Sequence, residues 1–129
     1  MTIDELRNFF SNDRVATYMG CRIIEADSNH SIVEIDIEEK HFNGNNCVQG
    51  GVFFTLADFA SAVTANADEI AFVSADGNIS FLSATQGSKL IAEATVIKRG
   101  KTLVFCDVVI NDDNNKIIAK ASFTMCRVK

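Results

Sequence analysis

The sequence has no excess of basic side chains. Its 129 residues include 12 lysines and arginines against 17 aspartates and glutamates, which gives a net charge of -5 at pH 7. Proteins that bind nucleic acid need a basic surface to meet the phosphates, so nucleic acid is excluded as a main partner. An acidic protein can still bind an anionic ligand at one local site.

Signals for export, disulfides and metal binding are also missing. The start of the chain, MTIDELRNFFSNDR, lacks the basic region, apolar core and cleavage site of a signal peptide. The four cysteines, at positions 21, 47, 106 and 126, have no CxxC or ligand-like spacing, which favours reduced thiols over a zinc site. We therefore expect a cytoplasmic protein without a metal. No repeat or linker interrupts the sequence, so residues 1–129 are expected to form one domain.

A membrane span is absent too, although one stretch is strongly apolar. Residues 50–67, GGVFFTLADFASAVTANA, are apolar on every side and contain a single ionisable group, Asp58. The apolar run is too short to cross a membrane, and an Asp at its centre would cost about 2.5 to 3.5 kcal/mol there. The pattern instead predicts a helix buried in the core. A buried carboxylate is costly unless it is paired or hydrogen-bonded, which makes Asp58 a candidate functional residue.

The remaining sequence predicts short helices followed by β-strands. Residues 3–19 have the loose apolar spacing of one or two amphipathic helices ending near Gly20, and apolar residues 33, 35 and 37 alternate strictly with acidic ones. Strands are predicted over residues 21–26, 31–40, 71–84, 89–98, 103–111 and 117–128. In the third of these strands, Ser74, Asp76, Asn78 and Ser80 are expected to share one polar face. The order predicts an α+β domain in which one antiparallel sheet wraps a single long helix.

Three segments of the chain resemble a known family. The runs FNGNNCVQGGVFFTLADFASAVTANA, VSADGNISFLSA and KRGKTLVFCDVVI are similar to the PaaI-like (phenylacetate-degradation-type) acyl-CoA thioesterases across nearly the full chain. The family pattern is an Asn, a Gly-Gly pair seven residues later, and an acid eight residues after the first Gly. Asn43, Gly50, Gly51 and Asp58 keep that spacing. The resemblance implies a hotdog fold and hydrolysis of an acyl-CoA to free acid and coenzyme A, without a cofactor.

The resemblance also implies roles for individual residues. Asp58 would be the catalytic carboxylate, as nucleophile or as general base, and Gly50 would donate to the oxyanion. Asn43 would be an orienting side chain, and Ser74 would help to place the nucleophile or water. Gln49 stands where the family commonly has His, a departure that bears on substrate preference.

Substrate binding is predicted at two places. Gln49 and Gly51 flank the proposed oxyanion donor. Lys98, Arg99 and Lys101 form the one compact basic cluster of an acidic chain, and the phosphates of coenzyme A need cations. The alternative is that this cluster is an ordinary solvated turn.

The spacing of Gly50 and Asp58 has a consequence for assembly. Eight residues of helix, at about 1.5 Å each, separate them by roughly 12 Å, so one thioester carbon cannot lie near both. If both act on one substrate, they must come from different subunits of a symmetric homodimer. We expect such dimers to pair further into a dimer of dimers.

Structural alternatives exist for each site residue. Asp58 can be a structural carboxylate, Asn43 a loop residue and Ser74 a plain strand serine. Burial would raise the pKa of Asp58, while hydrogen bonds from Ser74 or Asn43 would favour its ionised form. Cys47 lacks a partner base, and His41 belongs to no catalytic pattern.

For the whole protein two other functions stay open. One is a hotdog protein that binds an acyl-CoA or an acyl carrier without turnover, as a sensor or accessory subunit. The weaker one is a dehydratase, whose chemistry usually pairs the helix acid with a His that is Gln49 here.

Overall fold

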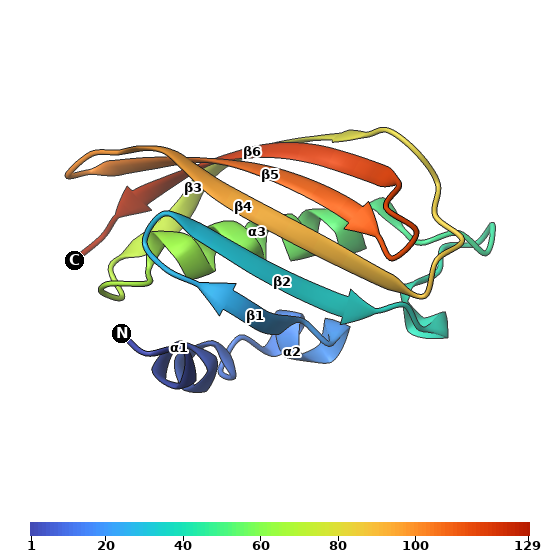
Figure 1. Ribbon diagram of the computed structural model, residues 1–129, viewed down its shortest axis with the longest axis horizontal. Coiled ribbons are helices and arrows are strands. Elements are labelled where there is room, and N and C mark those ends of the chain that lie inside the picture. Colours follow the sequence, from blue (N-terminus) through green and yellow to red (C-terminus); the bar gives the residue numbers. More distant parts are fainter.

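The computed structural model describes residues 1–129 and shows one antiparallel sheet curved around a long helix (Figure 1). The helices are α1 (Ile3–Phe10), α2 (Arg14–Met19) and α3 (Gly50–Ala65), with a short 3-10 helix η1 (Glu39–His41). The strands are β1 (Arg22–Ala26), β2 (His30–Asp36), β3 (Phe72–Phe81), β4 (Lys89–Arg99), β5 (Leu103–Asp112) and β6 (Ile117–Arg127). Their order in the sheet is β1-β2-β4-β5-β6-β3. The predicted α+β hotdog fold is confirmed.

The sheet buries one face of each central strand against α3. In β2, Ser31, Val33 and Ile35 are fully buried, whereas Glu34 and Asp36 point outward. β4, β5 and β6 alternate in the same way, and thirty buried apolar residues from the sheet and the helices form one core. The strand with one wet face that the alternation predicts is therefore present.

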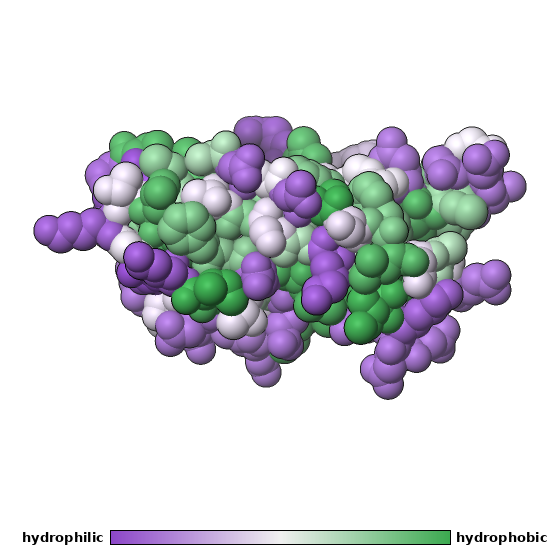
Figure 2. Space-filling model, turned by 90° about the horizontal axis from the view of Figure 1, so that it is seen from above, coloured by the Kyte–Doolittle hydropathy of each residue, from purple (hydrophilic) through white to green (hydrophobic).

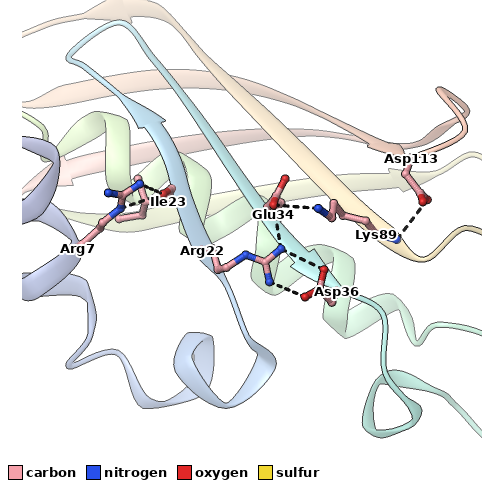
Figure 3. Close-up of polar contacts among 7 residues, drawn as sticks. All are labelled: Arg7, Arg22, Ile23, Glu34, Asp36, Lys89 and Asp113. Carbon is pink, nitrogen blue, oxygen red and sulfur yellow. Dashed lines mark hydrogen bonds and ion pairs between the residues drawn. The ribbon is translucent and has the colours of Figure 1, made fainter.

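Ion pairs connect three strands on the outer face of the sheet (Figure 3). Arg22 of β1 donates to Asp36 at 2.8 Å and to Glu34 at 2.9 Å, and Lys89 of β4 reaches Glu34 at 3.3 Å. The Arg22 guanidinium holds the pKa of both carboxyl groups below its usual range. Exposed pairs contribute little each to stability, so the hydrophobic core remains the main source of stability.

Two short helices precede β1, and the sequence sets their ends. Asp13 caps α2 by accepting the Ala16 N–H at 3.0 Å, and Gly20 ends it with a φ of 87°. That left-handed conformation favours glycine. Arg7 donates through Nε and Nη2 to the Ile23 carbonyl, at 3.1 and 2.8 Å, and so fastens α1 to β1 (Figure 3). One or two short helices were predicted before Gly20, and the structure has two.

The apolar run of residues 50–67 predicted a helix buried on every side. Within one chain α3 is not buried on all sides, so this prediction was wrong. Ten of its sixteen residues are buried. Apart from Gly50 at its start, the others are Gly51, Phe54, Thr55, Asp58 and Ala62, which remain partly or fully exposed. Their spacing of three, four and seven places them along one face of the helix. The sheet wraps the other faces. The exposed residues, called here the α3 stripe, run beside β3 at the edge of the sheet.

The polar face predicted for β3 is interrupted by a bulge. Ser74 pairs with Met125 of β6, but Asp76 pairs with Thr124, so Ala75 is the extra residue. A bulge shifts the alternation of side chains by one position. Ser74 therefore faces α3, whereas Asp76 and the polar residues after it face outward. The prediction that Ser74 shares their face was wrong.

Apolar side chains are exposed at several places on the surface. Figure 2 shows apolar groups between polar ones across the upper face of the molecule. Four exposed apolar residues lie on the α3 stripe or along β3 and its end, namely Phe54 at 36%, Val73 at 50%, Phe81 at 56% and Leu82 at 51%. None of the helices is long and apolar enough to cross a membrane.

Candidate active site

The first feature of the site is a contact between a strand and the central helix. The Ser74 hydroxyl of β3 donates to Oδ1 of Asp58 in α3 at 2.5 Å. The bulge in β3 turns Ser74 toward the helix, where its Oγ also lies 3.5 Å from the sulfur of Met125. The structure thus brings together two of the four predicted catalytic residues.

The surroundings of Asp58 perturb its acidity. Burial raises the pKa of its carboxyl group above the ordinary 3.8, the Ser74 hydrogen bond acts in the opposite direction, and the negative charge of Asp13 raises the pKa further. Of the two effects weighed for Asp58, burial therefore dominates. A partly buried carboxylate with a raised pKa is suited to accept a proton or to attack a carbonyl.

The second feature is the N-terminus of α3, where backbone donors are unused. Gly50 and Gly51 donate their N–H groups to no other group of the chain. Gln49 is the N-cap residue, but its side chain makes no capping hydrogen bond. Free N–H groups at this end, together with the positive end of the helix dipole, can bind a developing oxyanion.

The glycine pair leaves room that larger residues would fill. A Cβ on Gly50 would lie 3.0 Å from the ring of Phe81, and one on Gly51 would lie 2.6 Å from Oε1 of Gln49. Gly50 and Phe81 border an open cavity of about 410 Å³ together with Val48. No local pattern indicated Phe81 as a neighbour of Gly50, although the alternation in β3 places Phe81 on the face toward α3.

Gly50 and Asp58 remain apart in one chain. Eight residues of regular α-helix separate them by roughly 12 Å along the axis. The serine partner lies at Asp58 in the middle of α3, and the free donors lie at Gly50 and Gly51 at its start. Within one chain, the Ser74–Asp58 contact and the free N–H groups of Gly50 and Gly51 therefore do not meet.

Asn43 holds the loop that leads into α3. Its Oδ1 accepts the N–H groups of Asn45 at 2.8 Å and of Cys47 at 3.1 Å, and its own N–H donates to the Cys47 carbonyl at 2.7 Å. Asn43 is exposed and makes no hydrogen bond with Asp58. Its oxygen therefore shapes the loop, and a role toward a ligand would use its Nδ2 group.

The basic cluster is divided by the fold. Arg99 donates to the carbonyls of Thr64 at 3.0 Å, Ala65 at 3.1 Å and Ser28 at 2.8 Å. It thereby caps the last turn of α3, about 21 Å along the helix from Gly50. Lys98 and Lys101 remain exposed and form no ion pair. Within the cluster, these two lysines are the residues whose charged groups make no hydrogen bond, whereas the guanidinium of the exposed Arg99 makes three.

The side chains of the other candidate base, His41, and the other candidate nucleophile, Cys47, make hydrogen bonds only to nearby backbone groups. His41 is buried, with Nδ1 accepting the Glu38 N–H and Nε2 lying 2.9 Å from the Met19 carbonyl. Cys47 is exposed, and its Sγ contacts only the Asn45 carbonyl, at 3.7 Å. No cluster of three or more His, Cys, Asp or Glu side chains is arranged to hold a metal ion. The Ser74–Asp58 contact is the stronger candidate.

Comparisons with known proteins show what the chain is similar to. A model of the thioesterase superfamily matches residues 45–119. The acyl-coenzyme A thioesterase PaaI of Escherichia coli is 32% identical over 111 residues, covering 85% of this chain and 79% of that protein. Human acyl-coenzyme A thioesterase 13 is 34% identical over 106 residues, covering 79% and 76%. The structure of E. coli PaaI superposes with a TM-score of 0.88 at 27% identity, covering 95% of this chain and 90% of that one.

Proposed function

The chain belongs to the thioesterase superfamily, and from this premise we propose that it hydrolyses acyl-CoA to free acid and coenzyme A at a site shared by two subunits. Thioester hydrolysis is the activity of its family. The observation that supports the site most directly is the hydrogen bond from Ser74 to the partly buried carboxylate of Asp58. The relatives named as acyl-coenzyme A thioesterases support the choice of substrate.

Two routes for Asp58 balance the reaction. As a general base, its carboxylate takes a proton from water while the water oxygen bonds to the thioester carbon. The carbon–sulfur bond then breaks, and the proton passes to the sulfur of coenzyme A. As a nucleophile, a carboxylate oxygen bonds to that carbon, the thiolate leaves, and water cleaves the resulting anhydride. Both routes need an ionised Asp58, which the donor Ser74 favours.

Negative charge develops on the carbonyl oxygen in either route, and the free N–H groups of Gly50 and Gly51 are suited to receive it. Because these groups lie roughly 12 Å from Asp58 of the same chain, the donors come from the partner subunit. Gln49 and Asn43 would act there with Gly50, on the partner's side of the substrate.

The exposed edge of the molecule supports a dimer. β3 is an edge strand of ten residues, and most of them are exposed. A long exposed edge strand can pair with another strand. A second copy that pairs along β3 would extend the sheet and cover the α3 stripe with its apolar Phe54. The two-fold axis then creates two equivalent sites, and further pairing into a dimer of dimers stays a prediction.

Coenzyme A binding is assigned to the exposed lysines of the β4–β5 turn. Lys98 and Lys101 can each meet a phosphate, whereas Arg99 is held by carbonyls of α3 and supports the turn. A cytoplasmic location completes the proposal. It is supported by four cysteines that form no disulfide.

Thiol release from a series of acyl-CoA thioesters tests this function. The purified protein should release coenzyme A catalytically and sediment as a dimer or larger assembly. Binding of acyl-CoA without any thiol release would refute the enzyme and leave the non-catalytic binding protein as the function.

A further inference from the structure

A cavity of about 360 Å³ begins beside the Ser74 hydroxyl. It lies at the end of the molecule where the two termini meet (Figure 1), between α1, the second half of α3, the start of β3 and the C-terminus. Nine of its twelve lining residues are apolar, among them Phe9, Phe10, Phe72 and Met125. Because Ser74 also donates to Asp58, the cavity opens next to the proposed catalytic carboxylate.

The polar groups that line this cavity are already engaged. Both ends of the buried Asn66 amide are used, since Nδ2 donates to two backbone carbonyls and Oδ1 accepts two backbone N–H groups. The Ser74 hydroxyl donates to Asp58. The one charged lining residue is Lys129, which is exposed at the end of the chain. The interior therefore suits an uncharged, apolar group.

A thioester whose carbonyl carbon lies at Asp58 extends in two directions, as the coenzyme arm and as the acyl arm. Only one of these two arms fits the apolar lining of the cavity. The coenzyme arm begins with pantetheine, whose amides would lose water in the cavity and find no free partner, which is costly. An apolar acyl arm carries no such cost. Each CH₂ group that it buries improves binding about fourfold.

We propose that this cavity binds the acyl group of the thioester and that Phe9 of α1 is its specificity-determining wall. The inference rests on the acyl-CoA hydrolysis proposed above and adds the class of acyl group, which is apolar and uncharged. Phe9 is 40% exposed and meets the ring of Phe10 edge-on at 5.1 Å. Phe10 is buried and packs against Phe59 at 5.4 Å. Phe9 can thus be altered without opening the core.

Two variants change the cavity from opposite walls. Phe9→Ala removes apolar contact and should lower kcat/KM for octanoyl-CoA and benzoyl-CoA about tenfold, while acetyl-CoA changes less than about twofold. Ala62→Leu adds bulk from α3, one helical turn after Asp58, and should also reduce the preference for large acyl groups. Comparing the octanoyl and benzoyl substrates shows whether aliphatic or aromatic groups fit better.

Phe105→Ala is the matched control. Phe105 has a similar exposure of 38% but lies on β5 and does not line the cavity, so the ratio of large to small substrates should stay at the wild-type value. If the ratio of kcat/KM for large to small acyl groups were the same in all three variants, the cavity would not be the acyl-binding site.

A second measurement separates this inference from the proposed function. Binding of octanoyl-CoA and acetyl-CoA to Asp58→Asn, with and without Phe9→Ala, reports acyl contacts without turnover. If no thioester is hydrolysed but Phe9→Ala still weakens octanoyl-CoA selectively, the cavity assignment stands and only hydrolysis fails. If thioesters are hydrolysed with no such selectivity, the cavity assignment alone fails.

Discussion

The two ends of α3 differ in whether their terminal backbone groups have hydrogen-bond partners. At the C-terminal end, Arg99 donates to the carbonyls of Thr64 and Ala65, and the Asn66 amide joins Ala62 to the start of β3. At the N-terminal end, Gly50 and Gly51 leave their N–H groups free. The same helix therefore has one end where other groups donate to the carbonyls of Ala62, Thr64 and Ala65, and one end where two backbone donors stay unused.

This difference is the one expected if the C-terminal end is structural and the N-terminal end binds a ligand. Helix termini leave backbone groups without intrahelical partners, and a buried end normally finds other partners for them. The C-terminal end follows that rule with a charged side chain. The open N-terminal end is consistent with a place for a ligand oxygen, and Asp58 lies between the two ends, opposite Ser74.

Asp58→Asn should have the largest effect. The substitution removes the only acid of α3 while keeping its size, so turnover of acyl-CoA should fall by about a thousandfold or more. Circular dichroism and sedimentation should match the wild type. Turnover within tenfold of the wild type would remove Asp58 from the chemistry.

Mixed dimers test whether the open end of α3 serves the partner's Asp58. Gly50→Val places a branched side chain against Phe81 and beside the free donors, and should abolish turnover by itself. In a heterodimer with an Asp58→Asn chain, one site carries both defects and the other carries neither. About half of the wild-type activity should therefore return when subunits exchange.

Gly44→Ala is the control for this experiment, because a Cβ there has open space around it. Its homodimer should stay active. Inactive heterodimers, verified by mass, would exclude the shared site.

The sequence was sufficient to predict the layout of the fold and the main contact of the site. Strict alternation in β2 and the apolar run of α3 predict one sheet around one helix. The hydrogen bond of Ser74 to Asp58 was anticipated because the motif spacing pointed to Asp58 and the family resemblance pointed to Ser74. The layout of the fold depends on local periodicity, which a single sequence displays.

Features that depend on distant partners were not predictable. The bulge at Ala75 arises from the register of β3 against β6, which no local pattern specifies. Arg99 looks like part of a basic turn in the sequence, and only the fold brings the last carbonyls of α3 to it. The exposed α3 stripe likewise depends on how far the sheet wraps.

Substitutions in the β4–β5 turn test the capped end of α3. Arg99→Ala removes three charged hydrogen bonds and should lower the free energy of unfolding by about 2 kcal/mol in urea titrations. Lys98→Ala with Lys101→Ala should change it by less than about 0.5 kcal/mol, as surface substitutions do. This pair should instead raise KM for acyl-CoA but not for thioesters that lack the nucleotide. If Arg99→Ala and the double lysine variant changed the free energy of unfolding equally, Arg99 would not have the structural role that separates it from the two lysines.

The smallest expected effect is a shift in the pH dependence of turnover, which reports the environment of Asp58. Burial raises the pKa of its carboxyl group, and the ionised form is required, so kcat/KM should fall as pH decreases through that raised pKa. Ser74→Ala removes a donor to the carboxylate and should move this acidic limb to higher pH. Asp13→Asn removes a nearby negative charge and should move it to lower pH, while Asn still caps α2. General damage to the fold would shift the acidic limb of both variants in the same direction. Opposite shifts in Ser74→Ala and Asp13→Asn would therefore identify Asp58 as the titrating group.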